Sequence, residues 1–250
     1  MIKLLANEAI SVPFSRGDFL LIEYTVRVKD TGTIIDTTDL ELAKRENVYD
    51  PNKLYGQALI VLGKNWLNPY VEEEIAKMSE NEEKEIEVPP EKAFGLRDPN
   101  KVKVFSLRDF QRRGYEISVG DAVEIGGMRG IVRQISGGRV VIDFNHPLAG
   151  KVIVYKVRVV KKLEDFQEKV RALASRHLNI PASDIGLTYI PEEKKLLLQI
   201  SGKYITRENL GYAKLTLAAD VFELLGDNVD KLVYQEEVSK PSTQSSKTQK

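Results

Sequence analysis

The 250-residue sequence predicts an α+β fold in which antiparallel strands accompany short amphipathic helices. Three observations support this prediction. Residues 19–28 and 33–37 are expected to form a hairpin, because aromatic and β-branched residues alternate with polar ones on both sides of a turn that contains Gly32. Residues 68–78 have the pattern of a short helix, and three more strands at close spacing are predicted between residues 121 and 144.

The helix of residues 68–78 has a recognisable beginning. Asn68 can accept a hydrogen bond from a free backbone N–H of the first turn, and Pro69 stands where the helix needs no donor. Acidic residues suit the positive end of the helix dipole, and here they are Glu72, Glu73 and Glu74. One face is apolar and carries Val71, Ile75 and Met78. These features predict an amphipathic helix that covers a sheet.

The remaining elements follow from the same periodicities. Further helices are expected at residues 40–47, 108–113, 163–178 and 206–225. Thr206 is expected to cap the last of them, and Gly226 to end it. Strands are expected at residues 57–62, 83–88, 101–107, 121–125, 129–135, 139–144, 151–160, 185–190, 196–200 and 231–238.

The spacing of these elements predicts three domains and a tail. Glycine pairs at 126–127 and 137–138 separate close strands as hairpin turns. The strand at 151–160 is expected to return to the first sheet, so both ends of the β-rich segment before it must meet. The expected parts are residues 1–95 with 146–161, an inserted domain at 96–145, a separate α+β domain at 162–238, and a disordered tail at 239–250.

Composition excludes several classes of function. Lysine plus arginine equals aspartate plus glutamate at 37 each, so no net charge draws the protein to nucleic acid. The absence of cysteine removes disulfides, thiolate nucleophiles and cysteine-ligated metals. No apolar run approaches the length of a membrane span, and the N-terminal residues do not resemble a secretory signal. We therefore expect a soluble cytoplasmic protein without membrane partners.

Common catalytic and cofactor motifs are missing as well. The two histidines, His146 and His177, stand far apart, and no serine lies in a G-x-S-x-G turn. The glycine pairs separate strands and do not open helices, which is not the pattern of a phosphate-binding loop. Hydrolysis and nucleotide binding are thus unsupported, and we expect neither a metal nor another cofactor.

Five blocks in order resemble FKBP-type peptidyl-prolyl isomerases. They are the hairpin EYTVRVKDTGTIIDTT, the segment ending in EEEIAKM, the turn PPEKAFG, the block DFNHPLAGK and the strand VIVYKVRVV. The resemblance covers residues 18–161, and the segment between AFG and NHPLAGK resembles the insert-in-flap domain of the SlyD-like branch. The segment after it is similar to the extra C-terminal domain of long archaeal members. The resemblance implies an antiparallel half-barrel sheet wrapped on a short helix, with that insert in its flap.

The resemblance also implies an activity and a site. Isomerisation of a prolyl bond must overcome amide resonance, a barrier of about 18–20 kcal/mol, and needs a dry pocket but no nucleophile. The implied catalytic residues are Tyr24, Asp36, Phe94 and Tyr155. The implied substrate-binding residues are Ile35, Leu67, Val71 and Leu148. Without the resemblance, Tyr24 and Tyr155 would be interpreted as core aromatics of two strands.

The floor of the implied pocket departs from the family pattern. Asn68 stands where the family has an apolar residue, Tyr70 where it has glycine, and Val71 where it has a large aromatic ring. A valine offers less area to a proline ring than an aromatic side chain. Two hypotheses therefore stay open: an isomerase that assists folding, and a catalytically weak or inactive chaperone or interaction module.

The implied partners are unfolded or proline-containing polypeptides. A chaperone surface is expected on the insert, formed by Val102, Val104, Phe105, Phe110, Met128 and Ile131, with Ile125 among its further apolar residues. The alternative is that these residues pack the insert's own small core. The C-terminal domain is in addition a candidate for homodimer formation.

Overall fold

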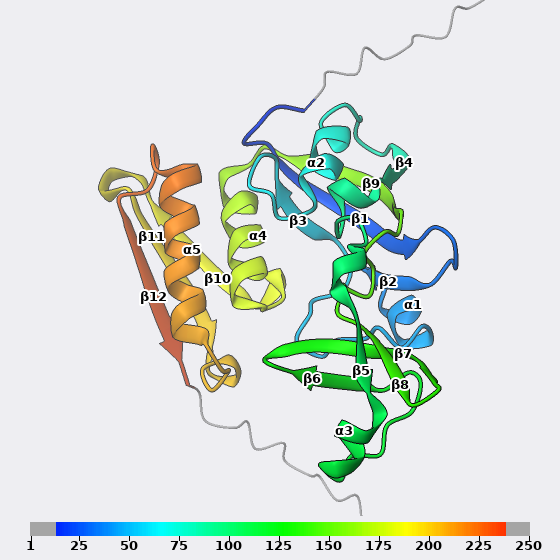
Figure 1. Ribbon diagram of the computed structural model, residues 1–250. Helices are drawn as coiled ribbons and strands as arrows, with labels where there is room; N and C mark the ends of the chain where they lie inside the picture. Colours follow the sequence, from blue (N-terminus) through cyan, green and yellow to red (C-terminus); the bar gives the residue numbers. More distant parts are fainter. Residues whose placement is uncertain (1–13, 239–250) are drawn as a thin grey trace, which may run out of the picture. The chain divides into compact units, whose positions relative to one another are not determined.

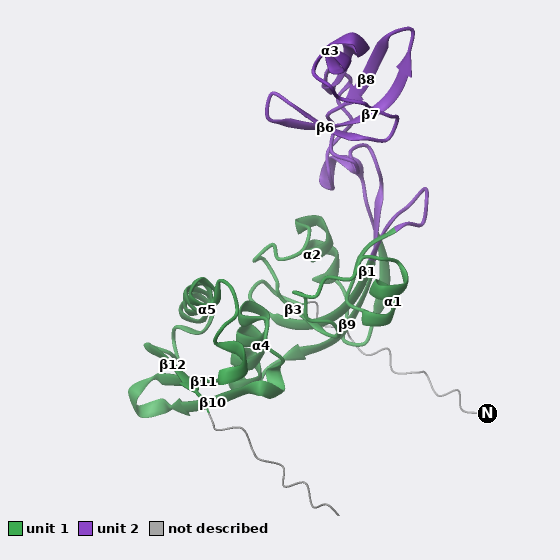
Figure 2. Ribbon diagram, turned by 90° about the horizontal axis from the view of Figure 1, so that it is seen from below, with its two compact units in different colours: residues 1–25, 34–86, 156–250 green, residues 26–33, 87–155 purple. Residues whose placement is uncertain are grey.

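The computed structural model describes residues 14–238, which form a mixed α+β protein of the predicted class (Figure 1). Two compact units divide these residues (Figure 2). Unit 1 comprises residues 14–25, 34–86 and 156–238, and unit 2 comprises residues 26–33 and 87–155. The tail expected to be disordered, at 239–250, lies outside the described residues.

A curled five-stranded sheet holds the first part of the chain. Its order is β2-β1-β9-β4, and β3 pairs with β1 in antiparallel register, with Phe19 opposite Val61. Its strands are β1 (Phe19–Val28), β2 (Ile34–Thr37), β3 (Ala58–Val61), β4 (Glu83–Val88) and β9 (Ile153–Leu163). The predicted hairpin of β1 and β2 is confirmed, and the short helix α1 (Leu40–Arg45) follows it.

Helix α2 (Pro69–Ile75) begins as the sequence predicts. The side chain of Asn68 accepts a hydrogen bond from the backbone N–H of Tyr70 at 3.0 Å, and Pro69 takes the first helical position. The predicted apolar face is buried and consists of Val71, Ile75 and Met78. Burial of that face removes apolar surface from water and so stabilises this part of unit 1.

Residues 102–143 form a four-stranded sheet of their own in unit 2. The order is β5-β8-β7-β6, and the small core consists of Val132, Val140 and Ile142 with half-buried residues around it. The elements are β5 (Val102–Ser106), α3 (Leu107–Arg112), β6 (Ala122–Ile125), β7 (Met128–Ser136) and β8 (Arg139–Asp143).

Hydrogen bonds join the two ends of this segment. The backbone N–H of Asp98 donates to the side chain of Asn145 at 2.8 Å, and the Asn145 amide donates back to the Asp98 carbonyl at 2.9 Å. Beside them, Arg97 pairs with the buried Asp143 at 2.5 Å. Burial raises the pKa of Asp143, but hydrogen bonds from Asn145 and the charges of Arg97 and Arg133 outweigh it and hold that pKa below its usual range.

The C-terminal segment packs as part of unit 1. Its elements are α4 (Phe166–Leu178), β10 (Ile185–Ile190), β11 (Lys195–Ser201), α5 (Leu210–Leu225) and β12 (Lys231–Glu237). Strand β11 lies between β10, to which it is antiparallel, and β12, to which it is parallel. Leu173 of α4 and Val221 of α5 belong to the same buried cluster as Phe19 of β1. This segment therefore shares a core with the first sheet and does not have one entirely of its own.

The predicted start of the last helix is wrong. Thr206 does not cap it, because α5 begins only at Leu210 and its N-cap is Asn209 without a side-chain cap hydrogen bond. Asn209 has φ of 60°, a left-handed conformation that a right-handed helix cannot continue through. The apolar periodicity of the segment indicated a helix, but not the turn that precedes it.

Candidate functional site

Three polar side chains of unit 1 meet at the ends of the first hairpin. Tyr24 of β1 donates its hydroxyl hydrogen to the Asp36 carboxylate of β2 at 2.9 Å. Lys53, from the loop before β3, forms an ion pair with the same carboxylate and donates to the Tyr24 hydroxyl at 3.3 Å. The structure thus brings together two of the predicted catalytic residues and adds a cation, Lys53, that the sequence analysis missed.

Backbone pairing holds this group in place. The N–H of Tyr24 donates to the Thr38 hydroxyl at 3.0 Å, and the N–H of Thr38 donates to the Tyr24 carbonyl at 2.9 Å. Lys53 also donates to the Thr37 carbonyl at 2.9 Å, and its ammonium lies 5.1 Å from the centre of the Tyr24 ring. The only local signal for Lys53 is its position between two tyrosines of one loop. Tyr49 and Tyr55 stack at 5.6 Å and give that loop its shape.

The other predicted residues of unit 1 lie on the neighbouring elements. Ile35 is half-buried on β2, beside Asp36. Leu67 is half-buried in the loop before α2, and Val71 of that helix is fully buried in the core. Of the three residues that depart from the family pattern, Val71 is therefore part of the core, whereas Asn68 and Tyr70 are half-buried.

A buried carboxylate shapes the loop that carries Leu67. Glu72 is 4% exposed, and its Oε2 accepts from the N–H of Gly63 at 2.9 Å and of Asn65 at 3.2 Å. Its Oε1 accepts from the N–H of Leu67 at 3.0 Å. The helix dipole explains why a negative charge is favourable at this helix end. It does not predict that the Glu72 carboxylate accepts hydrogen bonds from three N–H groups of the preceding loop. Glu72 thereby fixes the backbone on both sides of Trp66.

The predicted residues of unit 2 form a separate group. Phe94 is 41% exposed and stacks on His146, with ring centres 4.6 Å apart. The N–H of Leu148 donates to Nδ1 of His146 at 3.2 Å, so Phe94 and Leu148 flank the same imidazole. Tyr155 is half-buried on β9. The sequence places His146 in no catalytic triad, and no local pattern predicts that its ring stacks on Phe94.

The residues predicted as a chaperone surface lie on both faces of their sheet. Val104 and Phe105 are consecutive in β5, so their side chains point in opposite directions. Val104 and Met128 are 60% and 46% exposed, whereas Phe105 and Phe110 pack against the small core. The remaining two predicted residues, Val102 and Ile131, are half-buried.

A groove of about 860 Å³ opens on the α3 side of this sheet. Its apolar lining consists of Phe105, Phe110, Tyr115, Ile117, Val123 and Ile125. Tyr115 is 61% exposed at this groove and was not singled out from the sequence, because it stands in a loop without strand or helix periodicity. The groove offers aromatic and aliphatic surface next to strand β6.

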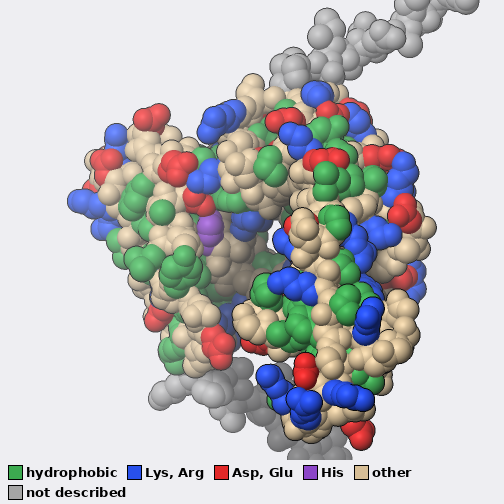
Figure 3. Space-filling model, viewed as in Figure 1, with side chains coloured by type: hydrophobic (Ala, Val, Ile, Leu, Met, Phe, Trp, Pro, Cys, Tyr) green, Lys and Arg blue, Asp and Glu red, His purple; other side chains and the backbone are tan. Residues whose placement is uncertain are grey.

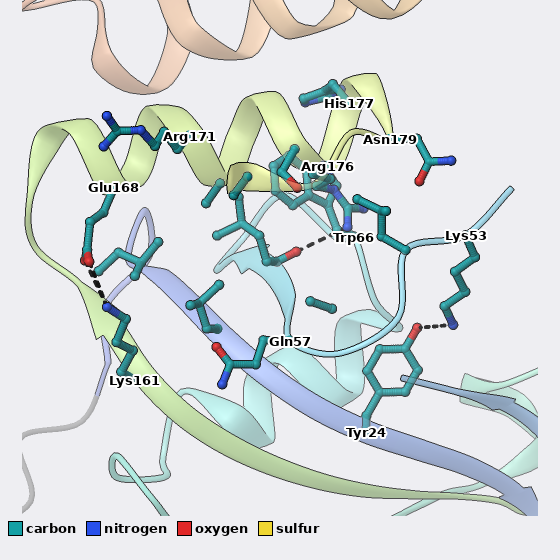
Figure 4. A pocket seen from close by; sticks show the side chains of 18 of the residues that line it. Tyr24, Lys53, Gln57, Trp66, Lys161, Glu168, Arg171, Arg176, His177 and Asn179 are labelled. Atoms are coloured by element: carbon teal, nitrogen blue, oxygen red, sulfur yellow. Dashed lines mark hydrogen bonds and ion pairs between the residues drawn. The ribbon is translucent and has the colours of Figure 1, made fainter. Parts of the chain in front are cut away.

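A second cleft of about 870 Å³ lies within unit 1, between helix α4 and the sheet (Figure 4). Tyr24 lines it near the hairpin, while Trp66 and Arg176 line its centre. The Arg176 guanidinium lies 4.1 Å from the centre of the Trp66 ring. Trp66 thus packs against the C-terminal segment.

A charged network joins the loop before α2 to helices α4 and α5. Asp220 is buried on α5 and pairs with His177 at 2.7 Å and with Lys64 at 2.8 Å. Burial lowers the pKa of His177, and the nearby charges of Arg176 and Lys64 act in the same direction, although the Asp220 carboxylate opposes them. The lowered pKa favours the neutral imidazole of His177 at neutral pH.

The described residues contain neither a cluster suited to a metal ion nor a helix suited to a bilayer. Among residues 14–238, no three or more histidine, aspartate or glutamate side chains gather in a way that could hold a metal ion. No helix in the same range has the length and apolar character needed to cross a bilayer.

Comparisons with known proteins give a consistent set of relatives. A family model described as "FKBP26, IF domain" matches residues 103–148. A short-type peptidyl-prolyl cis-trans isomerase of Methanocaldococcus jannaschii is 31% identical over 144 residues, which is 58% of this chain and 90% of that protein. The FKBP-type peptidyl-prolyl cis-trans isomerase SlyD of Treponema pallidum is 31% identical over 159 residues, 62% of this chain and 81% of the relative.

Two further matches have lower sequence identity. An FKBP-type 16 kDa peptidyl-prolyl cis-trans isomerase of Escherichia coli is 28% identical over 147 residues, 57% of this chain and 89% of that protein. The crystal structure of the three FKBP domains of wheat FKBP73 matches with a TM-score of 0.32 and 12% identity, over 62% of this chain and 42% of that one.

Proposed function

Because the chain belongs to the family of FKBP-type peptidyl-prolyl cis-trans isomerases, we propose that it catalyses cis-trans isomerisation of prolyl bonds in polypeptides and so assists their folding in the cytoplasm. The observation that carries this proposal is the group of Tyr24, Asp36 and Lys53, which places an ordered carboxylate beside an aromatic ring. We assign catalytic roles to Tyr24, Asp36, Phe94 and Tyr155, and substrate binding to Ile35, Leu67, Val71 and Leu148.

The chemistry requires selective binding of a twisted amide. Rotation about the prolyl bond destroys amide resonance, and the partial negative charge on the carbonyl oxygen falls as the bond twists. The Asp36 carboxylate near that oxygen disfavours the planar, more polarised amide relative to the twisted one. Apolar walls that hold the proline ring supply binding energy without stabilising the planar state. No proton transfer and no covalent intermediate are needed.

The second candidate function is a binding module with little catalysis. The observation that favours it is Val71, which is fully buried where the family has a large aromatic ring, and which leaves less ring area for proline. Two assays with the full chain distinguish the candidates: proline-limited refolding of a model protein, and cis-trans isomerisation of a proline peptide. Rates above buffer at micromolar protein in both assays support the isomerase. Rates equal to buffer in both would leave only the binding module.

We further propose that the four-stranded sheet of unit 2 is an insert-in-flap domain that captures unfolded chains. The groove beside β6 supports this proposal, since its exposed aromatic surface lies next to a strand at the edge of the sheet order β5-β8-β7-β6. The match of residues 103–148 to the "FKBP26, IF domain" model supports it as well.

The Tyr115→Ser variant should weaken chaperone activity, because it removes the most exposed aromatic side chain that lines the groove. We expect several-fold poorer suppression of aggregation of an unfolded client, measured by light scattering, with unchanged isomerisation of a short peptide. Val119→Ser is a matched control, since Val119 is also 61% exposed but does not line the groove. Equal losses in the two variants would argue against the groove as the capture site.

Homodimer formation through the C-terminal segment is a third part of the proposal. Hydrophobic side chains gather over α5 (Figure 3), where Tyr212, Leu215 and Phe222 are 72%, 71% and 44% exposed. Their helical spacing places them on one face, which a second copy can cover. Leu215→Glu should shift sedimentation equilibrium of the protein to the monomer mass, whereas the control Leu40→Glu on α1 should not. A wild-type protein that is monomeric at high micromolar concentration would contradict this part.

A further inference from the structure

The cleft of unit 1 has an unusual balance of charges. Its lining includes four cationic residues, Lys53, Lys161, Arg171 and Arg176, and two acidic ones, Asp50 and Glu168. Lys53 forms an ion pair with Asp36, and Lys161 forms an ion pair with Glu168 at 3.0 Å. Within residues 14–238, neither Arg171 nor Arg176 has a carboxylate within 4.0 Å. Among the described residues, the cleft therefore presents two arginines without an ion-pair partner against one carboxylate without one, that of Asp50, which leaves an excess of positive charge.

Arg176 is the better placed of the two arginines. One face of its guanidinium lies against the Trp66 ring, and Nη1 donates to the Leu59 carbonyl at 3.2 Å (Figure 4). A guanidinium carries five N–H donors, and an aromatic ring under its face leaves the edges available to a planar anion. Arg176 thus has donors left for a ligand in the cleft.

The surroundings of Arg176 also favour an anion. Desolvation by the protein atoms around the guanidinium lowers the pKa of Arg176, while the residue stays exposed to solvent at the cleft surface and so remains accessible to a ligand. The nearest opposing influences, from Tyr24, Asp220 and Glu72, act over a distance and form no ion pair with it in residues 14–238. A cation held this way gains from a carboxylate that arrives with a ligand.

We propose that this cleft binds a polypeptide segment that carries a carboxylate side chain next to an apolar residue, with the carboxylate on Arg176 and the apolar residue on Leu21, Leu59 and Trp66. The inference rests on the proposed function in one respect, since Tyr24 belongs to the proposed prolyl site and also lines the cleft. A polypeptide held at Tyr24 can continue along the cleft toward Arg176. A cleft of about 870 Å³ suits several residues and is far larger than one small anion requires.

The contrary explanation is that Arg176 has only a structural role. In that case its hydrogen bond to Leu59 and its contact with Trp66 hold α4 on the sheet, and no ligand is involved. The two explanations predict different peptide affinities, because an arginine with only a structural role gives no preference for acidic ligands.

Trp66 provides a direct readout, because it is the only tryptophan in the chain and lies in this cleft. Peptides of eight residues with one central proline, one leucine and one glutamate two, three or four positions from the proline are titrated against the full-length protein. Tryptophan emission reports binding, and each peptide is compared with its glutamine counterpart. We expect one spacing at which the glutamate peptide binds about tenfold more tightly, as a charge-assisted bond to a guanidinium supplies.

Variants assign the preference to Arg176. Arg176→Gln should abolish the glutamate preference, and Arg176→Lys should keep only part of it, because lysine cannot form a bidentate pair. Arg45→Gln is the matched control, since Arg45 is an exposed arginine of unit 1 on α1 outside the cleft. It removes the same charge and should leave the preference intact. The comparison of glutamate and glutamine peptides on the wild-type protein tests the inference without any variant, so it still decides if a variant folds poorly.

Each outcome has a definite meaning. Equal affinity of wild-type protein for glutamate and glutamine peptides at every spacing overturns the inference, and so does a preference that Arg176→Gln retains. Inorganic phosphate that alters Trp66 emission and displaces the peptides at equal concentration overturns the assignment to a polypeptide carboxylate. A glutamate preference without isomerisation in the rate assays supports this inference and removes only the proposed function. Isomerisation without the preference removes only this inference.

Discussion

Replacing Asp36 by asparagine is expected to lower kcat/KM for prolyl isomerisation by about tenfold to a hundredfold. Asparagine has nearly the same shape but no charge, so the Tyr24 hydroxyl loses its charged acceptor and Lys53 loses its counterion. Any electrostatic preference for the twisted amide disappears with the carboxylate. The measurement is peptide isomerisation at several substrate concentrations, which separates kcat from KM.

The matched control for this substitution is Asp30→Asn. Asp30 is an exposed aspartate of the hairpin turn, and it pairs with Lys151 at 3.2 Å. It should leave kcat/KM within about twofold of the wild-type value, because exposed ion pairs contribute little. Unchanged catalysis in Asp36→Asn, with an unchanged unfolding transition, would exclude Asp36 from the reaction and return the Tyr24 group to a structural role.

Replacing Glu72 by glutamine is expected to lower the free energy of unfolding by about 2–4 kcal/mol. Both oxygens of this buried carboxylate accept hydrogen bonds from backbone N–H groups, those of Gly63 and Asn65 on one oxygen and that of Leu67 on the other. A glutamine keeps one acceptor oxygen, and its NH₂ group must then face N–H donors. The loop around Trp66 should loosen as well, with a shift of tryptophan emission in the native state.

Glu73→Gln on the same helix is the control for the Glu72 substitution, since Glu73 is the next residue and is exposed. It should change the free energy of unfolding by less than about 0.5 kcal/mol, as is usual for surface sites. Urea unfolding followed by circular dichroism measures both variants. A Glu72→Gln protein as stable as Glu73→Gln would show that the three hydrogen bonds contribute nothing net to stability.

Local features of the fold followed from the sequence. The strand at Phe19–Val28 has the predicted limits, as do the strands at 83–88 and 185–190. Asn68 and Pro69 start a helix as expected. These features depend on side-chain alternation, capping and φ restriction within a few residues, so one stretch of chain is sufficient to predict them.

The prediction that Thr206 caps the last helix was wrong, because the start of that helix depends on more than its local sequence. A capping residue is recognised by its type, but the left-handed turn at Asn209 depends on the path that the chain takes out of η5 (Gly202–Tyr204). Apolar periodicity therefore indicates that a helix exists more reliably than it indicates where the helix begins.

The sequence by itself determined the α+β class, the hairpin that carries Tyr24 and Asp36, and the capped helix α2, because short-range sterics and hydrogen bonding decide them. Only the tertiary structure decided which distant groups meet. Lys53 reaches Asp36 across 17 positions, Glu72 turns back onto its preceding loop, and Arg176 stacks on Trp66 from the C-terminal segment. Such contacts depend on packing of whole elements, since a charged side chain takes the partner that burial leaves within its reach.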